Sequence, residues 1–216
     1  MNIPIIAAII LYISETIRFL ITILLLPKYN IAMNIINEFH DDQYPKIGEW
    51  KERGIARAIV INEEGLFAIH KISRDDIFGR YQYYETPGGG IDEGETPEVA
   101  VARECEEELG YKVQILDEIG IIKDEYALLG RININYYFLA KTVEKTSKHF
   151  VSTGDSLIDK TLYLPLNEII SLYEGTPNKD IPLLLKRREL PIWKEAKNKL
   201  LNKKDTLLLD KDVKLY

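Results

Sequence analysis

The chain carries, at residues 89–111, the stretch GGIDEGETPEVAVARECEEELGY. Thr96 and Pro97 are favourable residues for the N-cap and the first turn of a helix. Gly110 is a favourable residue just past the end of a helix, because glycine readily takes the left-handed conformation found there. The stretch therefore predicts a helix from Pro97 to about Leu109, preceded by a strand that ends in a run of glycines.

Three carboxylates share one face of this predicted helix. At about 100° per residue, Glu104, Glu107 and Glu108 fall within about 100° of one another, whereas Glu106 points away to solvent. Like charges at these spacings repel, so a positive partner is expected beside them. Carboxylate oxygens are ligands that Mg²⁺ and Mn²⁺ prefer, usually together with substrate phosphates. The alternative is an acidic face that only contacts solvent, and the spacing of the surrounding residues argues against it.

That spacing resembles the Nudix box, G-x5-E-x7-R-E-U-x-E-E-x-G-U, in which U is a bulky aliphatic residue. The fixed positions are all filled, by Gly89, Glu95, Arg103, Glu104, Glu107, Glu108 and Gly110. Two U positions hold Cys105 and Tyr111, which are apolar enough to pack. The resemblance implies an α/β fold, a Nudix-like α/β/α sandwich with a mixed β-sheet, over roughly residues 50 to 175.

The resemblance also implies a reaction. It predicts a metal-dependent pyrophosphohydrolase that cleaves a nucleoside diphosphate linked to a group X, giving a nucleoside monophosphate and P-X by metal-activated water attack. The implied ligands of Mg²⁺ or Mn²⁺ are Glu104, Glu107, Glu108 and the carbonyl of Gly89. Arg103 completes the implied catalytic set, with Glu95 as the partner through which it anchors the glycine loop.

Several points stay open at this stage. The general base is Glu104 or an acidic residue further along, for which Glu144, Asp155 and Asp159 are the candidates. Substrate contacts are assigned to Tyr84, Gly88, Gly90 and Tyr137. The alternatives for the activity are a nucleoside triphosphate sanitising pyrophosphatase, an ADP-ribose or nucleotide-sugar hydrolase, and a Nudix-fold sensor that binds a nucleotide without cleaving it. His70 and His149 are expected to have structural roles only.

Composition narrows the class of partner. The chain has 216 residues and a net charge of −6, which argues against a nucleic-acid backbone as the main partner but not against a small phosphorylated ligand. Its single cysteine, Cys105, excludes an internal disulfide and fits a reducing cytoplasm. The oligomeric state stays open, with a homodimer among the options.

Residues 3–26 form a hydrophobic segment long enough to cross a bilayer. Glu15 and Arg18 lie near its middle, so the summed insertion free energy is close to zero. Three interpretations follow: a membrane helix with the catalytic domain on the cytoplasmic side, a mis-assigned start with translation beginning at Met33, or a helix packed on the domain. The expected organisation is a hydrophobic N-terminal segment at 1–32, a Nudix domain at 33–205 and a tail at 206–216.

The remaining pattern predicts the other elements. Strands are expected at 55–62, 66–72, 81–86, 112–122, 132–141 and 161–164, and helices at 167–173 and 182–202, the second interrupted at Pro191. Residues 30–50 read as a linker, while 73–79 and 142–158 read as loops. Asn133 and Asn135 alternate with apolar residues, which predicts a strand with one face on a polar cavity. The basic run at 186–188 is expected to be a solvated face.

Overall fold

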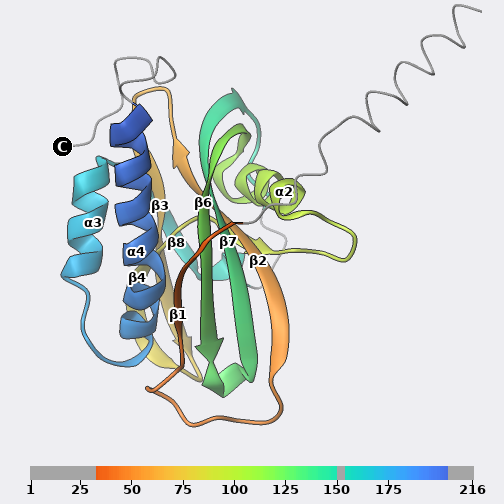
Figure 1. Ribbon diagram of the computed structural model, residues 1–216, viewed down its shortest axis with the longest axis vertical. Coiled ribbons are helices and arrows are strands. Elements are labelled where there is room, and N and C mark those ends of the chain that lie inside the picture. Colours follow the sequence, from red (N-terminus) through yellow and green to blue (C-terminus); the bar gives the residue numbers. More distant parts are fainter. Residues whose placement is uncertain (1–32, 150–153, 204–216) are drawn as a thin grey trace, which may run out of the picture. The chain divides into compact units, whose positions relative to one another are not determined.

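The computed structural model describes residues 33–149 and 154–203 of the chain, which form a mixed β-sheet with helices on both faces (Figure 1). The strands are β1 (Ile35–Phe39), β2 (Lys51–Ile61), β3 (Phe67–Asp76), β4 (Gly79–Glu85), β5 (Gly88–Gly90), β6 (Tyr111–Tyr126), β7 (Arg131–Lys145) and β8 (Ile158–Leu164). Their order is β1-β6-β7-β2-β3-β4, with β5 paired to β2 and β8 to β3. The β1–β6 and β2–β7 pairs are parallel and the others antiparallel, which confirms the predicted mixed sheet.

Three helices cover this sheet. Helix α2 (Pro97–Leu109) packs against β2, β5 and β6, whereas α3 (Leu166–Glu174) packs against α4 (Asp180–Lys203), which also contacts β1, β4 and β6. In Figure 1, α2 lies on one side of the sheet and α3 and α4 lie on the other. This arrangement matches the predicted layers, and it places α2 at the end of the sheet where β5 meets β2.

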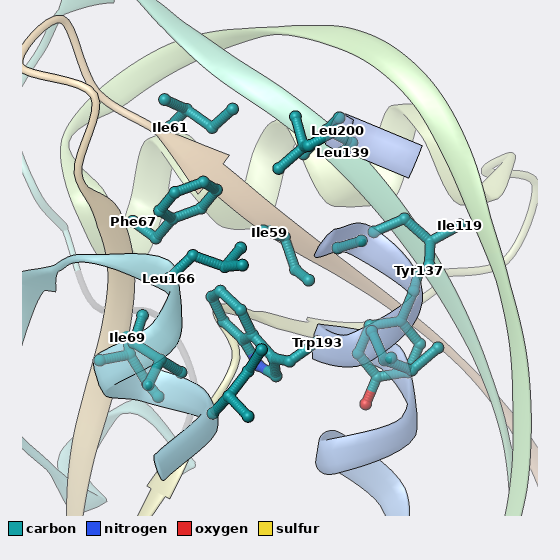
Figure 2. Packing of buried hydrophobic residues seen from close by; sticks show 14 of the residues in the cluster. Ile59, Ile61, Phe67, Ile69, Ile119, Tyr137, Leu139, Leu166, Trp193 and Leu200 are labelled. Atoms are coloured by element: carbon teal, nitrogen blue, oxygen red, sulfur yellow. The ribbon is translucent and has the colours of Figure 1, made fainter. Parts of the chain in front are cut away.

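Alternation along the strands explains how both faces are filled. Successive side chains of a strand point to opposite faces, so Ile59 and Ile61 of β2 face α3 and α4, while Ala58 and Val60 face the other way. Figure 2 shows both isoleucines in the cluster that contains Trp193 of α4, with Ile59 beside the Trp193 ring. The Trp193 ring meets Phe67 edge to face at 6.0 Å, a favoured aromatic geometry. Burying each such large apolar side chain stabilises the fold by about 1.5–3 kcal/mol.

Several elements differ from the sequence-based expectation. Residues 35–39, predicted as part of a linker, form β1, and β3 runs on to Asp76 through most of the predicted loop at 73–79. The two long strands are longer than predicted, and only the short 3-10 turn η1 (Ala127–Leu129) and Gly130 separate them. These strands gain their extra length from pairing with each other, which no local pattern reports.

Helix α4 is continuous, so the predicted interruption at Pro191 is wrong. A proline inside a helix removes the hydrogen bond to the carbonyl four residues earlier, here that of Arg187. The Nδ2 atom of Asn37 in β1 donates to this carbonyl at 3.1 Å. The missing bond is therefore replaced by a residue that is 150 positions away in the sequence.

Three predictions concern the ends of the chain: the hydrophobic segment 3–26, the alternative start at Met33 and the tail 206–216. Residues 1–32 and 204–216 lie outside the described residues, so the N-terminal helix stays a prediction. Across 33–149 and 154–203, no helix combines the length and the apolar character needed to cross a membrane.

Candidate active site

The three glycines predicted to end a strand form β5, a short strand held against β2. Gly88 has a φ of +137°, and a Cβ atom there would lie 2.2 Å from the carbonyl oxygen of Ala56. Only glycine fits at this position, because any side chain would collide with the backbone of β2. Local backbone packing thus fixes the position of the loop between β4 and α2.

Helix α2 begins and ends where the sequence predicts. The Thr96 side chain accepts a hydrogen bond from the amide of Val99, and Gly110 follows the helix with a φ of +72°. Cys105 and Leu109 are buried beneath the helix, so the face that carries the glutamates is fixed in orientation. Glu104 and Glu108 are themselves only 7% and 5% exposed, which excludes the alternative of a fully solvated acidic face.

Glu104 lies directly against Gly89. A Cβ atom at Gly89 would be 2.5 Å from Oε1 of Glu104, so the carboxylate occupies space that only a glycine leaves open. Burial, opposed by a hydrogen bond from Arg103 and reinforced by the charge of Glu108, raises the pKa of Glu104 to about 7. The carboxylate is thus held in a partly desolvated position next to the backbone of β5.

Arg103 joins the glycine loop to the glutamates. Its Nε and Nη2 atoms donate to the two carboxylate oxygens of Glu95, each at 2.9 Å, and Nη2 also donates to the carbonyl of Gly90 at 2.9 Å. Its Nη1 atom donates to Glu104 at 2.9 Å and lies 3.6 Å from Glu107. The hydrogen bonds from Arg103 lower the pKa of Glu95 to about 2, which keeps this clamp ionised. The geometry agrees with the predicted anchoring pair of Arg103 and Glu95.

Glu108 is held by donors on the other side of the site. The amide of Gly88 and Nε2 of His70 lie 2.8 and 3.1 Å from the same oxygen, Oε2. The other ring nitrogen of His70 lies 3.1 Å from the hydroxyl of Thr161, which accepts a hydrogen bond from Lys148 at 3.0 Å. Because an ionised carboxylate only accepts, the hydrogen bond to Glu108 needs a proton on Nε2 of His70, and Nδ1 of the neutral ring then accepts from the Thr161 hydroxyl. Within the described residues no donor reaches Oε1 of Glu108, which leaves that oxygen for a ligand.

These groups border one cavity of about 620 Å³, a volume that suits a small ligand. The carboxylates of Glu104, Glu107 and Glu108 lie at one part of its wall. The rest of the wall carries an aromatic and aliphatic group and a set of arginines. The aromatic and aliphatic group is Ile55, Ile72, Phe78, Tyr83, Tyr126, Leu129, Leu157 and Ile158, and the arginines are Arg53, Arg57, Arg74, Arg103, Arg131 and Arg188.

A buried ionic network supports the wall beside the carboxylates. Glu85 pairs with Arg57 at 2.7 Å and with Arg188 at 2.6 Å. Although burial opposes ionisation, these two guanidinium groups lower the pKa of Glu85 to about 2. Arg188 also pairs with Glu189 at 2.8 Å, and Glu189 accepts hydrogen bonds from Thr86 and Tyr137. Arg188 is only 1% exposed, so the prediction of a solvated face at 186–188 is wrong for this residue.

Comparison with known proteins places the chain in a family. The sequence profile of the NUDIX domain matches residues 51–185, which is more than half of the chain. The chain belongs to the Nudix family. Nudix hydrolases act on the diphosphate bonds of small-molecule nucleotide derivatives, and the box at residues 89–111 is the part of this chain that first indicated membership.

Solved structures agree on the Nudix fold. A NUDIX hydrolase from Nitrosomonas europaea is 17% identical, with a TM-score of 0.51, and the match covers 74% of this chain and 98% of that one. The MutT protein from Methanosarcina mazei Go1 is 18% identical, with a TM-score of 0.52, and the match covers 71% of this chain and 99% of that one. At such low identity the likeness extends to the fold alone. No curated protein matches the sequence.

The structure places some residues predicted for this Nudix site in the cavity wall and others elsewhere. Gly88, Gly89, Gly90 and Arg103 line the cavity together with the three glutamates. Tyr84 packs against the core instead, and Tyr137 is fully buried with its hydroxyl on Glu189, so neither tyrosine predicted to contact substrate lies in the wall. The aromatic surface of the wall comes from Phe78, Tyr83 and Tyr126.

The candidates for the general base also differ in whether they line the cavity. Glu104 lines the cavity, whereas Glu144 pairs with Lys112 on an exposed surface and Asp159 pairs with Lys71, both outside the wall. Asp155 lies in the turn η2 (Asp155–Leu157), whose neighbour Gly154 borders the cavity, but the described part of the chain does not include its side chain.

Sequence reasoning missed His70. It lies in a buried apolar part of β3 and is only 2% exposed. A polar residue at such a position needs a hydrogen-bond partner, and that requirement was the available signal that His70 contacts another buried polar group. The structure supplies Glu108 as this partner, which brings His70 into the Nudix site.

Proposed function

We propose that this chain hydrolyses the diphosphate linkage of a nucleoside diphosphate derivative, with a divalent ion, Mg²⁺ or Mn²⁺, held by Glu104, Glu107 and Glu108. The observation that carries this proposal is the gathering of three carboxylates from one helix face on the wall of a single cavity, next to a strand of glycines. An alternative role as a nucleotide sensor has less support, because every fixed residue of the box is present and in contact with its partners.

The donor set fits such an ion in its chemistry. Carboxylate oxygens and a backbone carbonyl such as that of Gly89 are the hard ligands that Mg²⁺ and Mn²⁺ take. Across 33–149 and 154–203, no three acidic, histidine or cysteine side chains stand close enough to form a ready-made cluster. The guanidinium of Arg103 pairs with both Glu104, at 2.9 Å, and Glu107, at 3.6 Å.

The bound ion supplies positive charge for the diphosphate oxygens and lowers the pKa of a water molecule. The chain's own residues do the rest. Attack of water on one phosphorus forms a new P–O bond and breaks the bond to the bridging oxygen, and the water must lose a proton to a base. Of the candidates with described side chains, Glu104 is the one in the cavity wall, which supports it as the base. Arg103 and His70 are positioning residues for Glu104 and Glu108.

A panel of nucleotides tests the proposal. Purified protein is incubated with nucleoside triphosphates, nucleotide sugars, ADP-ribose and dinucleoside polyphosphates, with Mg²⁺ or Mn²⁺, and products are identified by ³¹P NMR. Glu104→Gln and Glu108→Gln are expected to lower kcat by at least about 10²-fold, the scale on which loss of a key charge-stabilising group acts. Glu106→Gln is the matched control, since Glu106 is on the same helix but outside the cavity wall.

Two outcomes contradict the proposal. The first is wild-type turnover that survives an excess of EDTA. The second is a Glu106→Gln variant that loses as much activity as the two cavity variants, because the loss then follows the charge of the helix and not the site.

A further inference from the structure

Two arginines in the cavity wall have no acidic partner. Across the described residues, Arg53 and Arg131 make no ion pair and no hydrogen bond through their guanidinium groups. The other four are paired: Arg57 with Glu85 at 2.7 Å, Arg188 with Glu85 at 2.6 Å, Arg74 with Asp76 at 2.6 Å and Arg103 with Glu95 at 2.9 Å. Arg53 and Arg131 are therefore the arginines of the wall that no ion pair within the described residues holds, although the charges of Glu104 and Asp92 act on Arg53 from further away.

The two unpaired arginines lie together. Strands β2 and β7 run parallel with Arg53 opposite Asn133, and Arg131 lies two residues before Asn133 on the same face of β7. Asn133 is 2% exposed and lines the same cavity, and its amide lies beside the buried carboxylate of Asp124, on which it acts as a hydrogen-bond donor. One part of the wall thus brings two cationic donors together.

In the absence of a ligand, the positive charges of these arginines repel one another. Desolvation lowers the pKa of Arg53, and the charges of Arg131 and Arg57 lower it further. Like charges in a partly desolvated cavity repel, and an anion between them converts that repulsion into attraction. Arginine is well suited to this task, because its planar donors match phosphate oxygens in pairs.

The donors adjoin the carboxylate part of the site. A Cβ atom at Gly89 would meet Glu104, and one at Gly90 would lie 2.3 Å from Nη2 of Arg53. Successive strand residues are about 3.4 Å apart, so Glu104 and Arg53 lie beside neighbouring positions of β5, and both line the same cavity. A substrate whose diphosphate lies at the carboxylates has its next group within reach of these arginines.

We infer that Arg53 and Arg131 form a subsite for an anionic group X, so that the preferred substrate carries a further phosphate beyond the cleaved diphosphate. A nucleoside triphosphate is the simplest such substrate, and a nucleoside diphosphate joined to a neutral sugar lacks the feature. This inference rests on the proposed function, because it assigns which end of the substrate the arginines contact.

The test compares two substrates that share a nucleoside and differ in X. Each nucleoside triphosphate of the panel is matched with the corresponding nucleoside diphosphate glucose, and kcat/KM is measured for wild type, Arg53→Gln and Arg131→Gln. For the triphosphate we expect each substitution to lower kcat/KM by about 10- to 100-fold, the worth of a hydrogen bond to a charged group. For the sugar derivative we expect a change of less than about threefold. Arg80→Gln is the control, since Arg80 is exposed and outside the cavity wall.

A loss that is equal for both substrates overturns the inference, because the arginines then contact the shared diphosphate or support the fold. An absence of loss for both overturns it as well. Arg53→Lys and Arg131→Lys are expected to retain charge but recover only part of the discrimination, because lysine cannot bind phosphate through two parallel hydrogen bonds.

Binding separates failure of the subsite from failure of the proposed function. Calorimetric titrations of the full chain use the α,β-methylene analogues of a nucleoside triphosphate and of the matching diphosphate. We expect the triphosphate analogue to bind at least about tenfold more tightly, and the Arg53→Gln/Arg131→Gln variant to lose this difference. If this pattern appears without turnover of any substrate, the subsite stands and hydrolysis does not. If turnover occurs and the two analogues bind equally, the subsite is wrong.

Discussion

Replacing Gly89 by alanine is the sharpest test of how the carboxylate of Glu104, which we propose to be catalytic, is placed. Gly89 does not have a positive φ, so alanine is acceptable to the backbone and the change adds a single methyl group. That methyl carbon would lie 2.5 Å from Oε1, 2.7 Å from Oε2 and 2.7 Å from Cδ of Glu104. The carboxylate must therefore move, while the strand and the helix keep their positions.

The size of the effect follows from these distances. Ordinary contacts of a Cβ atom begin at about 3.4 Å, so the carboxylate has to move by about 0.9 Å from its 2.5 Å approach. A misplacement of about 1 Å in a catalytic group lowers the rate by about 10²-fold, equivalent to about 2.7 kcal/mol of transition-state stabilisation. We expect Gly89→Ala to lower kcat by about this factor.

The assay measures kcat under saturating substrate and Mg²⁺, together with thermal unfolding of each variant. Gly175→Ala is the matched control, because a Cβ atom at Gly175 would be no closer than 3.4 Å to its neighbours and its φ is −76°. Glu104→Asp provides a second check. The aspartate side chain is one methylene shorter, so it leaves more room for a methyl group at residue 89. Gly89→Ala should therefore lower kcat less in the Glu104→Asp background than in the wild type, and the two effects are not additive.

Retention of activity within threefold by Gly89→Ala would refute this reasoning, since the carboxylate position would then not matter at the scale of an ångström. A fall in melting temperature that accounts for the lost activity would refute it too, because the cause would be unfolding and not displacement of Glu104.

Three further perturbations address the surroundings of the site. Because the folded-state pKa of Glu104 is raised from 4.5 to about 7, the ionised carboxylate destabilises the fold as pH rises through that window. Glu104→Gln should therefore be more stable than wild type by about 1–3 kcal/mol in EDTA at pH 8 and equal to it near pH 4, as measured by urea unfolding. Glu95→Gln weakens the hydrogen bonds that hold Arg103. It should lower kcat or Mg²⁺ affinity by about 10- to 100-fold, the range seen when a partner of a metal ligand is lost. An unchanged Mg²⁺ titration together with an unchanged kcat would count against this role of Glu95. Arg188→Met removes the guanidinium that pairs with the buried Glu189 and one of the two that pair with Glu85. It should lower the free energy of unfolding by about 3–5 kcal/mol, and a loss under 1 kcal/mol would speak against a buried network.

Features encoded by neighbouring residues could be predicted from the sequence. The caps of α2, the shared face of its three glutamates and the glycines of β5 all depend on residues within about one helix length of each other. Their interactions are set by helical and strand geometry, so spacing alone carries the information. Elements that depend on distant partners were missed. Strand β1 exists because it pairs with β6, and α4 stays continuous through Pro191 because Asn37 replaces the lost hydrogen bond.

The residues of the site also fall into those that local spacing predicts and those that only folding brings together. Its carboxylates come from one helix and were found by their spacing, whereas its arginines come from β2, β3, α2, β7 and α4 and meet only in the folded chain. An arginine in sequence gives no sign of whether its partner is a glutamate, as for Arg188, or a ligand, as we infer for Arg53. Whether an arginine pairs with an acidic residue or is left for a ligand depends on the other charged side chains around the cavity, and these are brought together only by folding. For that reason family membership follows from the local box, while the choice of substrate depends on groups brought together by the long-range pairing of strands.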